Sequence, residues 1–328
     1  MSTTNPATTP IKITSDAERK SAMKARMRLL VPYAALVALF LLFTVLKGST
    51  FVAPSNLLVI LQQSVVLAIV AYGMTFVIAS GSIDLSVGSV VSLSGVLTAI
   101  VGIQHGMVGL LVGAGVGALA GLINGLVFAY AKIPSFIITL GMLQVASGLS
   151  ILISGGSSQP MPDEGLLPSL GVLPGILIVA VVITLIAGFL FQYTVFGRRV
   201  RAIGGNERVA TLAGVPVRST KVWIFTLSGL MAGIGGAILA ARLGAGSPVA
   251  GMTFELDVIA AVVIGGTPLT GGLGRITGTI IGALIMSMLA NGLVLIGVGS
   301  AEQTIVKGIV LALAVLISLD RSKIGIIK

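Results

Sequence analysis

The chain has 328 residues, of which 55% are hydrophobic and 9% are charged, and its formal net charge is +10 at pH 7. Soluble domains carry about 25% charged residues, so this composition excludes a water-soluble fold and indicates that a lipid bilayer surrounds most of the chain. Cys is absent and His105 is the single histidine, which excludes disulfides, thiolate metal sites and multi-histidine metal sites.

Residues 1–27 form a polar and then basic tail ahead of the first apolar run. Asp16 and Glu18 in this tail, and the lack of a small-residue cleavage site after the apolar run, argue against a signal peptide. A membrane-crossing helix needs about 20 residues, so long charge-free stretches mark the spans. Ten spans are predicted, at 28–47, 56–79, 84–103, 107–131, 135–153, 171–191, 221–242, 255–266, 274–297 and 301–319. The transmembrane domain therefore covers 28–320, and a second short tail covers 321–328.

The loop 192–221, between the sixth and seventh spans, holds the only long polar segment after residue 30. Six of the 20 Lys and Arg residues lie in it, namely Arg198, Arg199, Arg201, Arg208, Arg218 and Lys221. Basic loops of membrane proteins face the cytoplasm, which places this loop there and, with an even number of spans, both termini as well. Because the basic residues gather in loops and tails rather than along one exposed helix face, nucleic-acid binding is not expected.

A short helix is predicted within this loop, at 206–214. Asn206 is a suitable N-cap, Glu207 favours the first turn, and Gly214 suits the position after the helix end. An apolar patch on this helix is formed by Val209, Leu212 and Ala213. Two helical turns are not stable alone, so the helix packs either on a cytoplasmic partner or on the base of this chain and the lipid headgroups.

An internal repeat is indicated by the similarity of 83–87 to 254–258, each of which follows a Gly/Ser-rich turn and opens an apolar helix. One helix later, glycines recur at helical spacing, at Gly109, Gly113, Gly117, Gly121 and Gly125 and again at Gly274, Gly278 and Gly282. Such glycines let helices approach closely, either inside one chain or at a moving or dimer-forming contact. The predicted topology puts the two copies on opposite sides, as in an inverted repeat, although chance similarity is an alternative in so apolar a chain.

Candidate residues for a solute path are the polar side chains within or beside the spans, namely Gln62, Asp84, Ser86, Asn124 and Asn291. Amides bind hydroxylated solutes, but they also cross-link helices, and Asp84 is equally suited to capping the third span. No cluster of carboxylates indicates an ion site. The sequence contains no Walker-type glycine loop and no HExxH motif, so we expect neither catalytic residues nor a metal site.

Three stretches make the chain resemble the permease subunits of bacterial ABC sugar importers of the ribose type. They run from Gly73 to Ser89, from Gly197 to Val215 and from Phe254 to Gly272. Together they span most of the chain after residue 50, and their combination is specific. One departure is Pro268, at a position where the family pattern favours a small polar residue.

The resemblance implies an all-α polytopic protein of the type II ABC importer kind, with ten helices in two inverted pseudo-repeats, in the bacterial inner membrane with both termini cytoplasmic. It further implies a permease homodimer or heterodimer around a central path, a periplasmic sugar-binding protein outside and an ABC ATPase in the cytoplasm. The ATPase would grip a coupling helix built from Gly205, Asn206, Glu207, Val209, Leu212, Ala213 and Gly214. This chain would bind no cofactor, since ATP and Mg belong to the ATPase.

We therefore expect a permease that translocates a monosaccharide, ribose-like or related, by alternating access. These residues do not determine which sugar is carried or whether the paired subunits are identical. The main alternative is an ion-coupled secondary transporter of a small polar solute, against which the scarcity of deeply placed carboxylates argues. An intramembrane enzyme and a purely structural membrane protein are further alternatives. The lack of Cys argues against the first, and the capped loop helix is not explained by the second.

Overall fold

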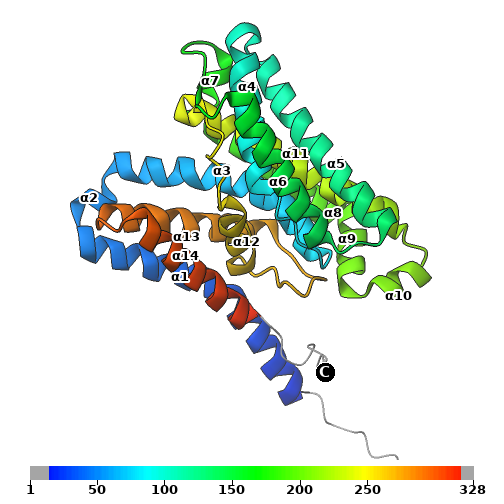
Figure 1. Cartoon of the computed structure of the whole chain (residues 1–328). Helices are drawn as coiled ribbons and strands as arrows, with labels where there is room; N and C mark the ends of the chain where they lie inside the picture. Colours follow the sequence, from blue (N-terminus) through cyan, green and yellow to red (C-terminus); the bar gives the residue numbers. More distant parts are fainter. Residues whose placement is uncertain (1–14, 319–328) are drawn as a thin grey trace, which may run out of the picture.

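The computed structural model describes residues 15–318, with side chains for residues 30–316 (Figure 1). The helices are α1 (Ser15–Lys47), α2 (Ser49–Val52), α3 (Pro54–Ala79), α4 (Val87–His105), α5 (Val108–Ala131), α6 (Ser135–Ser154), α7 (Leu166–Ser169), α8 (Gly175–Tyr193), α9 (Val195–Gly205), α10 (Glu207–Leu212), α11 (Val217–Leu243), α12 (Phe254–Ile264), α13 (Ile276–Leu295) and α14 (Ser300–Ser318). The strands are β1 (Gln159–Pro160) and β2 (Ala245–Gly246). This confirms the predicted all-α fold. Of the predicted first tail, 1–27, residues 15–27 are helical and belong to α1, whereas 1–14 and the predicted second tail, 321–328, lie outside the described residues.

Eight helices in the described part of the chain are long and apolar enough to cross a membrane: α1 from Leu30 onward, α3, α4, α5, α6, α8, α11 and α13. They coincide with eight of the ten predicted spans. The predicted spans 255–266 and 301–319 correspond to α12 and α14, which do not meet this criterion. With 11 residues, α12 rises only about 16 Å, about half of a hydrocarbon core. For these two helices a full crossing stays a prediction.

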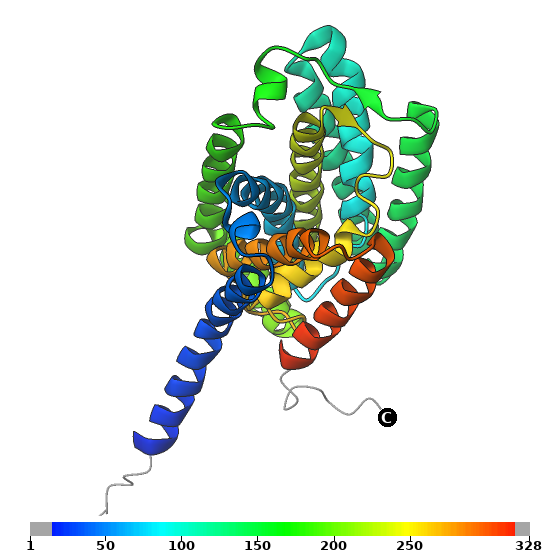
Figure 2. The ribbon, with the colours of Figure 1, turned by 90° about the vertical axis from the view of Figure 1, so that its left-hand side faces the viewer.

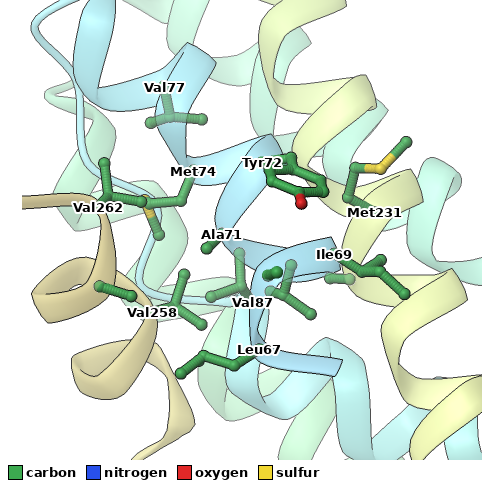
Figure 3. Close-up of a cluster of buried hydrophobic side chains, with 14 of the residues drawn as sticks. Leu67, Ile69, Ala71, Tyr72, Met74, Val77, Val87, Met231, Val258 and Val262 are labelled. Atoms are coloured by element: carbon green, nitrogen blue, oxygen red, sulfur yellow. The ribbon is translucent and has the colours of Figure 1, made fainter. Parts of the chain in front are cut away.

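The helices α3, α4, α11 and α13 form the centre of the molecule, and α1, α6 and α8 lie outside them (Figure 2). Other helices surround these central helices, so no side of them faces water and all sides can be apolar. In Figure 3, Met74 of α3 lies beside Val262 of α12, whereas Tyr72 of α3 faces Met231 of α11. The short α12 is therefore anchored in the core even though it cannot span a bilayer alone.

The regularly spaced glycines are helix contacts within this one chain, except Gly274, which lies before α13 and faces the side chains of Phe191 and Ala79. A Cβ atom added at Gly117 or Gly121 of α5 would collide with the backbone of α11 at Gly229 or Phe225. In the second half, Gly278 and Gly282 of α13 lie in the same way against α12, at Gly265 and Ala261. In a lipid environment, where apolar burial gives little drive for helix association, this close backbone contact stabilises the pairs.

The connections between the helices gather on two opposite faces, which we name by the helix that each carries (Figures 1 and 2). On the α10 face, the amide of Gly272 donates a hydrogen bond of 2.9 Å to the carbonyl of Ala79 at the end of α3. On the α7 face, β1 pairs antiparallel with β2, and the amide of Met161 donates to the carbonyl of Gly244 at 3.1 Å. The connections 80–86, 132–134, 205–216 and 265–275, predicted to be cytoplasmic, share the α10 face. The connections 154–174 and 244–253, predicted to be outside, share the α7 face, whereas α2 lies apart from α7 (Figure 1).

Candidate functional site

The predicted loop helix is present as α10, with the expected caps at both ends. The side chain of Asn206 accepts a hydrogen bond of 3.0 Å from the amide of Val209, which satisfies one of the free donors of the first turn. The chain leaves the helix through Gly214 in a left-handed conformation, with φ of +78°. After it, the amide of Val215 donates to the carbonyl of Ala210 at 3.0 Å. Local sequence therefore determines both ends of α10.

Two contacts hold α10 on the base of the chain. Ala210 is buried in a small apolar cluster with Ile203 of α9 and Val217 of α11. In addition, Lys221 Nζ lies 2.7 and 2.8 Å from the two carboxylate oxygens of Glu207, which connects α10 to α11. The Lys221 ammonium also lies 4.4 Å from the centre of the Phe128 ring, at the end of α5. A displacement of α10 would therefore move α11.

The opposite side of α10 is uncovered. Val209 is 59% exposed and Leu212 is 82% exposed, and Ala213 is exposed beside them. Two partners were considered for this helix, the base of the chain and another protein, and each suits a different side of it. Ala210 packs on the chain itself, while the predicted apolar patch faces away from it. Exposed apolar side chains on a short helix that is attached to the chain outside the spans are suited to contact with another protein.

A groove of about 890 Å³ lies next to α10, between the end of α5 with the turn that follows it and the segment from α10 to the start of α11. Its lining is Phe128, Ala129, Tyr130, Lys132, Ile133, Pro134, Glu207, Thr211, Pro216, Val217, Arg218, Ser219 and Lys221. The Arg218 guanidinium lies 5.7 Å from the centre of the Tyr130 ring. Three cations and one carboxylate make this groove basic.

An irregular segment, residues 82–86, separates α3 from α4, with Ser82, Asp84 and Ser86 buried and Ile83 and Leu85 half-buried. Its backbone is satisfied by side chains of α6. The amide of Ile83 donates to Ser135 Oγ at 3.2 Å, and the amide of Leu85 donates to Thr139 Oγ1 at 3.1 Å. Irregular backbone among membrane helices is tolerated where the protein supplies such partners, and broken helices of this kind surround the solute paths of transporters.

Asp84, in this segment, is the centre of a hydrogen-bonded cluster. Asp84 Oδ1 accepts from the amide of Ser86 at 3.0 Å and from its hydroxyl at 2.6 Å, while Oδ2 accepts from Ser228 Oγ of α11 at 2.9 Å. Asn124 Nδ2 of α5 donates to Ser86 Oγ at 3.0 Å. All four residues are at most 2% exposed. The carboxylate therefore connects the start of α4 to α5 and α11, rather than capping the first turn of α4.

The structure brings together three of the five candidate path residues, Asp84, Ser86 and Asn124. Ser228 completes this cluster, and sequence reasoning missed it because nothing distinguishes a serine in an apolar helix 144 positions away. Asn291 lies elsewhere, in a cavity of about 400 Å³ between α3, α11, α12, α13 and α14. Gln63 lines this cavity with it, whereas the adjacent candidate Gln62 does not.

Groups of three or more His, Asp or Glu side chains that could hold a metal ion do not occur among the residues that the structure describes.

Comparison with known proteins gives consistent matches over most of the chain. Residues 56–319 match the profile of the family described as branched-chain amino acid transport system / permease component. The chain is similar to the ribose import permease protein of Bacillus subtilis (strain 168), with 43% identity over 309 residues that cover 90% of this chain and 94% of the relative. The corresponding protein of Escherichia coli (strain K12) is 40% identical, over 88% and 94%. The xylose transport system permease protein of the same strain is 34% identical, over 96% and 98%. No solved structure gives a significant match.

Proposed function

The chain belongs to the branched-chain amino acid transport system permease family, and we propose that it is the membrane subunit of an ABC importer for a monosaccharide. Relatives that this chain covers almost completely are named for ribose and xylose import, which supports a pentose or related sugar as the solute. The ion-coupled alternative is not favoured by these relatives. The observation that carries the proposal is α10, a capped helix that packs on the base of the chain through Ala210 and leaves its apolar patch uncovered.

A separate cytoplasmic ATPase docks on α10 in this proposal. Its contact surface comprises Gly205, Asn206, Glu207, Val209, Leu212, Ala213 and Gly214, of which Val209 and Leu212 supply the apolar anchors. ATP and Mg are bound by that partner, and this chain hydrolyses nothing. The orientation that suits this arrangement places the α10 face, together with the start of α1 and the end of α14, in the cytoplasm (Figure 1). A periplasmic sugar-binding protein then docks on the α7 face.

Motion of α10 reaches the broken helix through a continuous series of contacts. The ion pair between Glu207 and Lys221 connects α10 to α11, and α11 holds Asp84 through Ser228. Asp84 in turn determines the conformation of Ser86 at the start of α4. In this proposal the Asp84 cluster shapes the segment beside the solute path, and a shift of α11 re-packs the start of α4. The second permease subunit covers the exposed outer helices on one side of the chain.

The proposal is tested with the importer reconstituted in proteoliposomes together with its partner ATPase and binding protein. Uptake of labelled ribose and xylose is measured with and without ATP, and with an ion gradient alone. We expect uptake only with ATP. The double variant Glu207→Arg, Leu212→Arg is expected to lose both uptake and stimulated ATP hydrolysis, because it places two cations on the docking surface. Unchanged uptake and unchanged hydrolysis in this variant would show that α10 is not the docking element.

A further inference from the structure

Two helices of this chain, α4 and α12, begin inside the membrane rather than at its surface. Before α4, the amide of Leu85 donates to Thr139, one turn from the start of α6 at the α10 face. Before α12, the carbonyl of Pro248 accepts from Ser150 Oγ at 3.5 Å, one turn from the end of α6 at the α7 face. These two levels are about 16 Å apart along α6, and the starts of α4 and α12 lie between them, within the depth of the hydrocarbon core.

The starts of these two helices touch each other at this depth. The amide of Gly251 donates to Ser92 Oγ of α4 at 2.8 Å, and a Cβ atom added at Gly251 would collide with the carbonyl of Gly88. A Cβ atom added at Gly88 would in turn collide with Oε2 of Glu255, in the first turn of α12. The carboxylate of Glu255 therefore lies against the first turn of α4, far from either membrane surface.

Glu255 differs from Asp84 and Asp257, the other two carboxylates near these helix starts. Asp84 is sealed and accepts three hydrogen bonds, and Asp257 is paired with Lys307 of α14. Glu255 is half-buried, and within residues 30–316 no cation pairs with it and no other side chain donates to it. A carboxylate that faced lipid at this depth would be costly, so the exposed part of Glu255 faces water or another polar surface.

Other exposed polar groups lie on the same side of the molecule. Thr253, two residues before Glu255, is exposed, and so is Gln144 in the middle of α6. On the right-hand side of Figure 2 lie α6, the segment before α12 and α14, whereas α8 lies on the left. The exposed residues in the middle of α8 are all apolar, with Leu185 67% exposed, which suits contact with lipid. We name Gln144, Thr253 and Glu255 the polar strip.

We propose that the polar strip lines the solute path and that Glu255 binds the translocated monosaccharide in transit. The two carboxylate oxygens accept hydrogen bonds from neighbouring sugar hydroxyls, and the side chains of Thr253 and Gln144 both donate and accept. The inference rests on the proposed function, and it assigns the side of this chain that the second permease subunit covers. Because the starts of α4 and α12 meet beside Glu255, a shift of α4 changes the surface that the sugar contacts.

The first test measures uptake of labelled ribose by the importer reconstituted with its ATPase and binding protein. We expect Glu255→Leu to take up ribose about tenfold more slowly, because it loses hydrogen bonds to a charged acceptor, and Glu255→Gln to lose less, because an amide oxygen still accepts. The melting temperature should not fall, since no partner of Glu255 is left unpaired. Glu302→Gln is the matched control, because Glu302 is an exposed carboxylate in the first turn of α14, and it should keep normal uptake. Normal uptake by Glu255→Leu would overturn the proposal, as would equal losses in both Glu255 variants with a lower melting temperature.

The second test asks whether the polar strip faces water, and it does not depend on transport. The chain contains no Cys, so Gln144→Cys and Thr253→Cys each place a single thiol in the strip. We expect a water-soluble thiosulfonate reagent to label both about tenfold faster than Leu185→Cys on α8, because a thiol in hydrocarbon does not ionise. Labelling of both as slow as that of Leu185→Cys would overturn the proposal. A disulfide between two copies without labelling would identify the strip as a closed subunit contact and also overturn it. If the wild type takes up no ribose although both thiols are labelled, the proposed function fails and the assignment of the path stands.

Discussion

Replacement of Ser228 by Ala tests whether the Asp84 cluster holds α11 to the start of α4. The substitution removes one hydroxyl and leaves Asp84 Oδ2 without its donor at 2.9 Å. Asp84 is 1% exposed, so water cannot replace the lost hydrogen bond in this conformation. Ser228 itself is fully buried, and the change to Ala introduces no steric conflict.

The expected cost follows from the charge and burial of the acceptor. Hydrogen bonds between membrane helices contribute about 0.6 kcal/mol on average, because the unfolded chain finds other partners in the membrane. A hydrogen bond to a charged group contributes about 1.5–3 kcal/mol, and leaving a buried acceptor unsatisfied adds to the cost. Since a sealed carboxylate is the acceptor here, the second estimate applies, and we expect a loss of about 1.5–3 kcal/mol. At about 2 °C per kcal/mol for a chain of this length, the melting temperature falls by about 3–6 °C.

The assay is thermal unfolding of the purified protein in detergent, combined with a double-mutant cycle. Ser228→Ala is measured in the wild type and in Asp84→Asn, where its cost should drop by about 1 kcal/mol or more because the charged acceptor is absent. Ser94→Ala is the matched control, because Ser94 of α4 is also fully buried but its hydroxyl has no partner within residues 30–316. It should be neutral or slightly stabilising. Equal losses for Ser228→Ala and Ser94→Ala, or a coupling energy near zero, would refute the reasoning.

Three further results are expected. Lys221→Glu should reduce uptake strongly but change the melting temperature little, because its partner Glu207 is 53% exposed. The charge exchange Glu207→Lys, Lys221→Glu should restore part of the uptake that either single variant loses. Gly121→Val should prevent accumulation of folded protein in membranes, because its side chain would overlap the backbone of α11, whereas Gly115→Ala on the same helix meets no atom within 4 Å and should fold normally. Lys307→Met should lower the free energy of unfolding, as measured by denaturant titration. Breaking a fully buried ion pair costs about 3–5 kcal/mol, and the loss here should be smaller because the pair with Asp257 is only partly buried.

The loop helix illustrates what local sequence can predict. Asn206 and Gly214 determine where α10 begins and ends through hydrogen bonds to neighbouring backbone groups, so its bounds were predictable. The apolar patch at Val209 and Leu212 was also predictable, because it depends only on the spacing of these residues within one short helix. The contact of Ala210 with the base of the chain was not, because it depends on α9 and α11 folding back over the same place.

The regularly spaced glycines were informative in another way. Spacing at helical intervals predicted close helix contacts, and the structure confirms them. Their partners differ, however. In the first set, Gly109 and Gly113 pack on the preceding helix α4, whereas Gly117, Gly121 and Gly125 pack on α11 from the other half of the chain. In the second set, Gly278 and Gly282 pack on α12 and its C-cap Gly265, whereas Gly274 lies against the side chains of Phe191 and Ala79. A glycine marks a surface that another backbone approaches, but it carries no side chain that would identify which one.

Residue order alone placed the eight long helices, the sides on which their loops group and the ends of α10, because each depends on properties of one continuous stretch: its length without charge, its turn residues and its caps. The pairing of Asp84 with Ser228, and the position of Gln63 and Asn291 in the lining of one cavity, required the folded chain. In a soluble helix, a stripe of apolar residues marks the inner side. Here the sides that face lipid and the sides that face other helices are equally apolar, so the spacing of apolar residues does not indicate which side of a helix faces inward. Only the packing of the helices decides which polar groups come together.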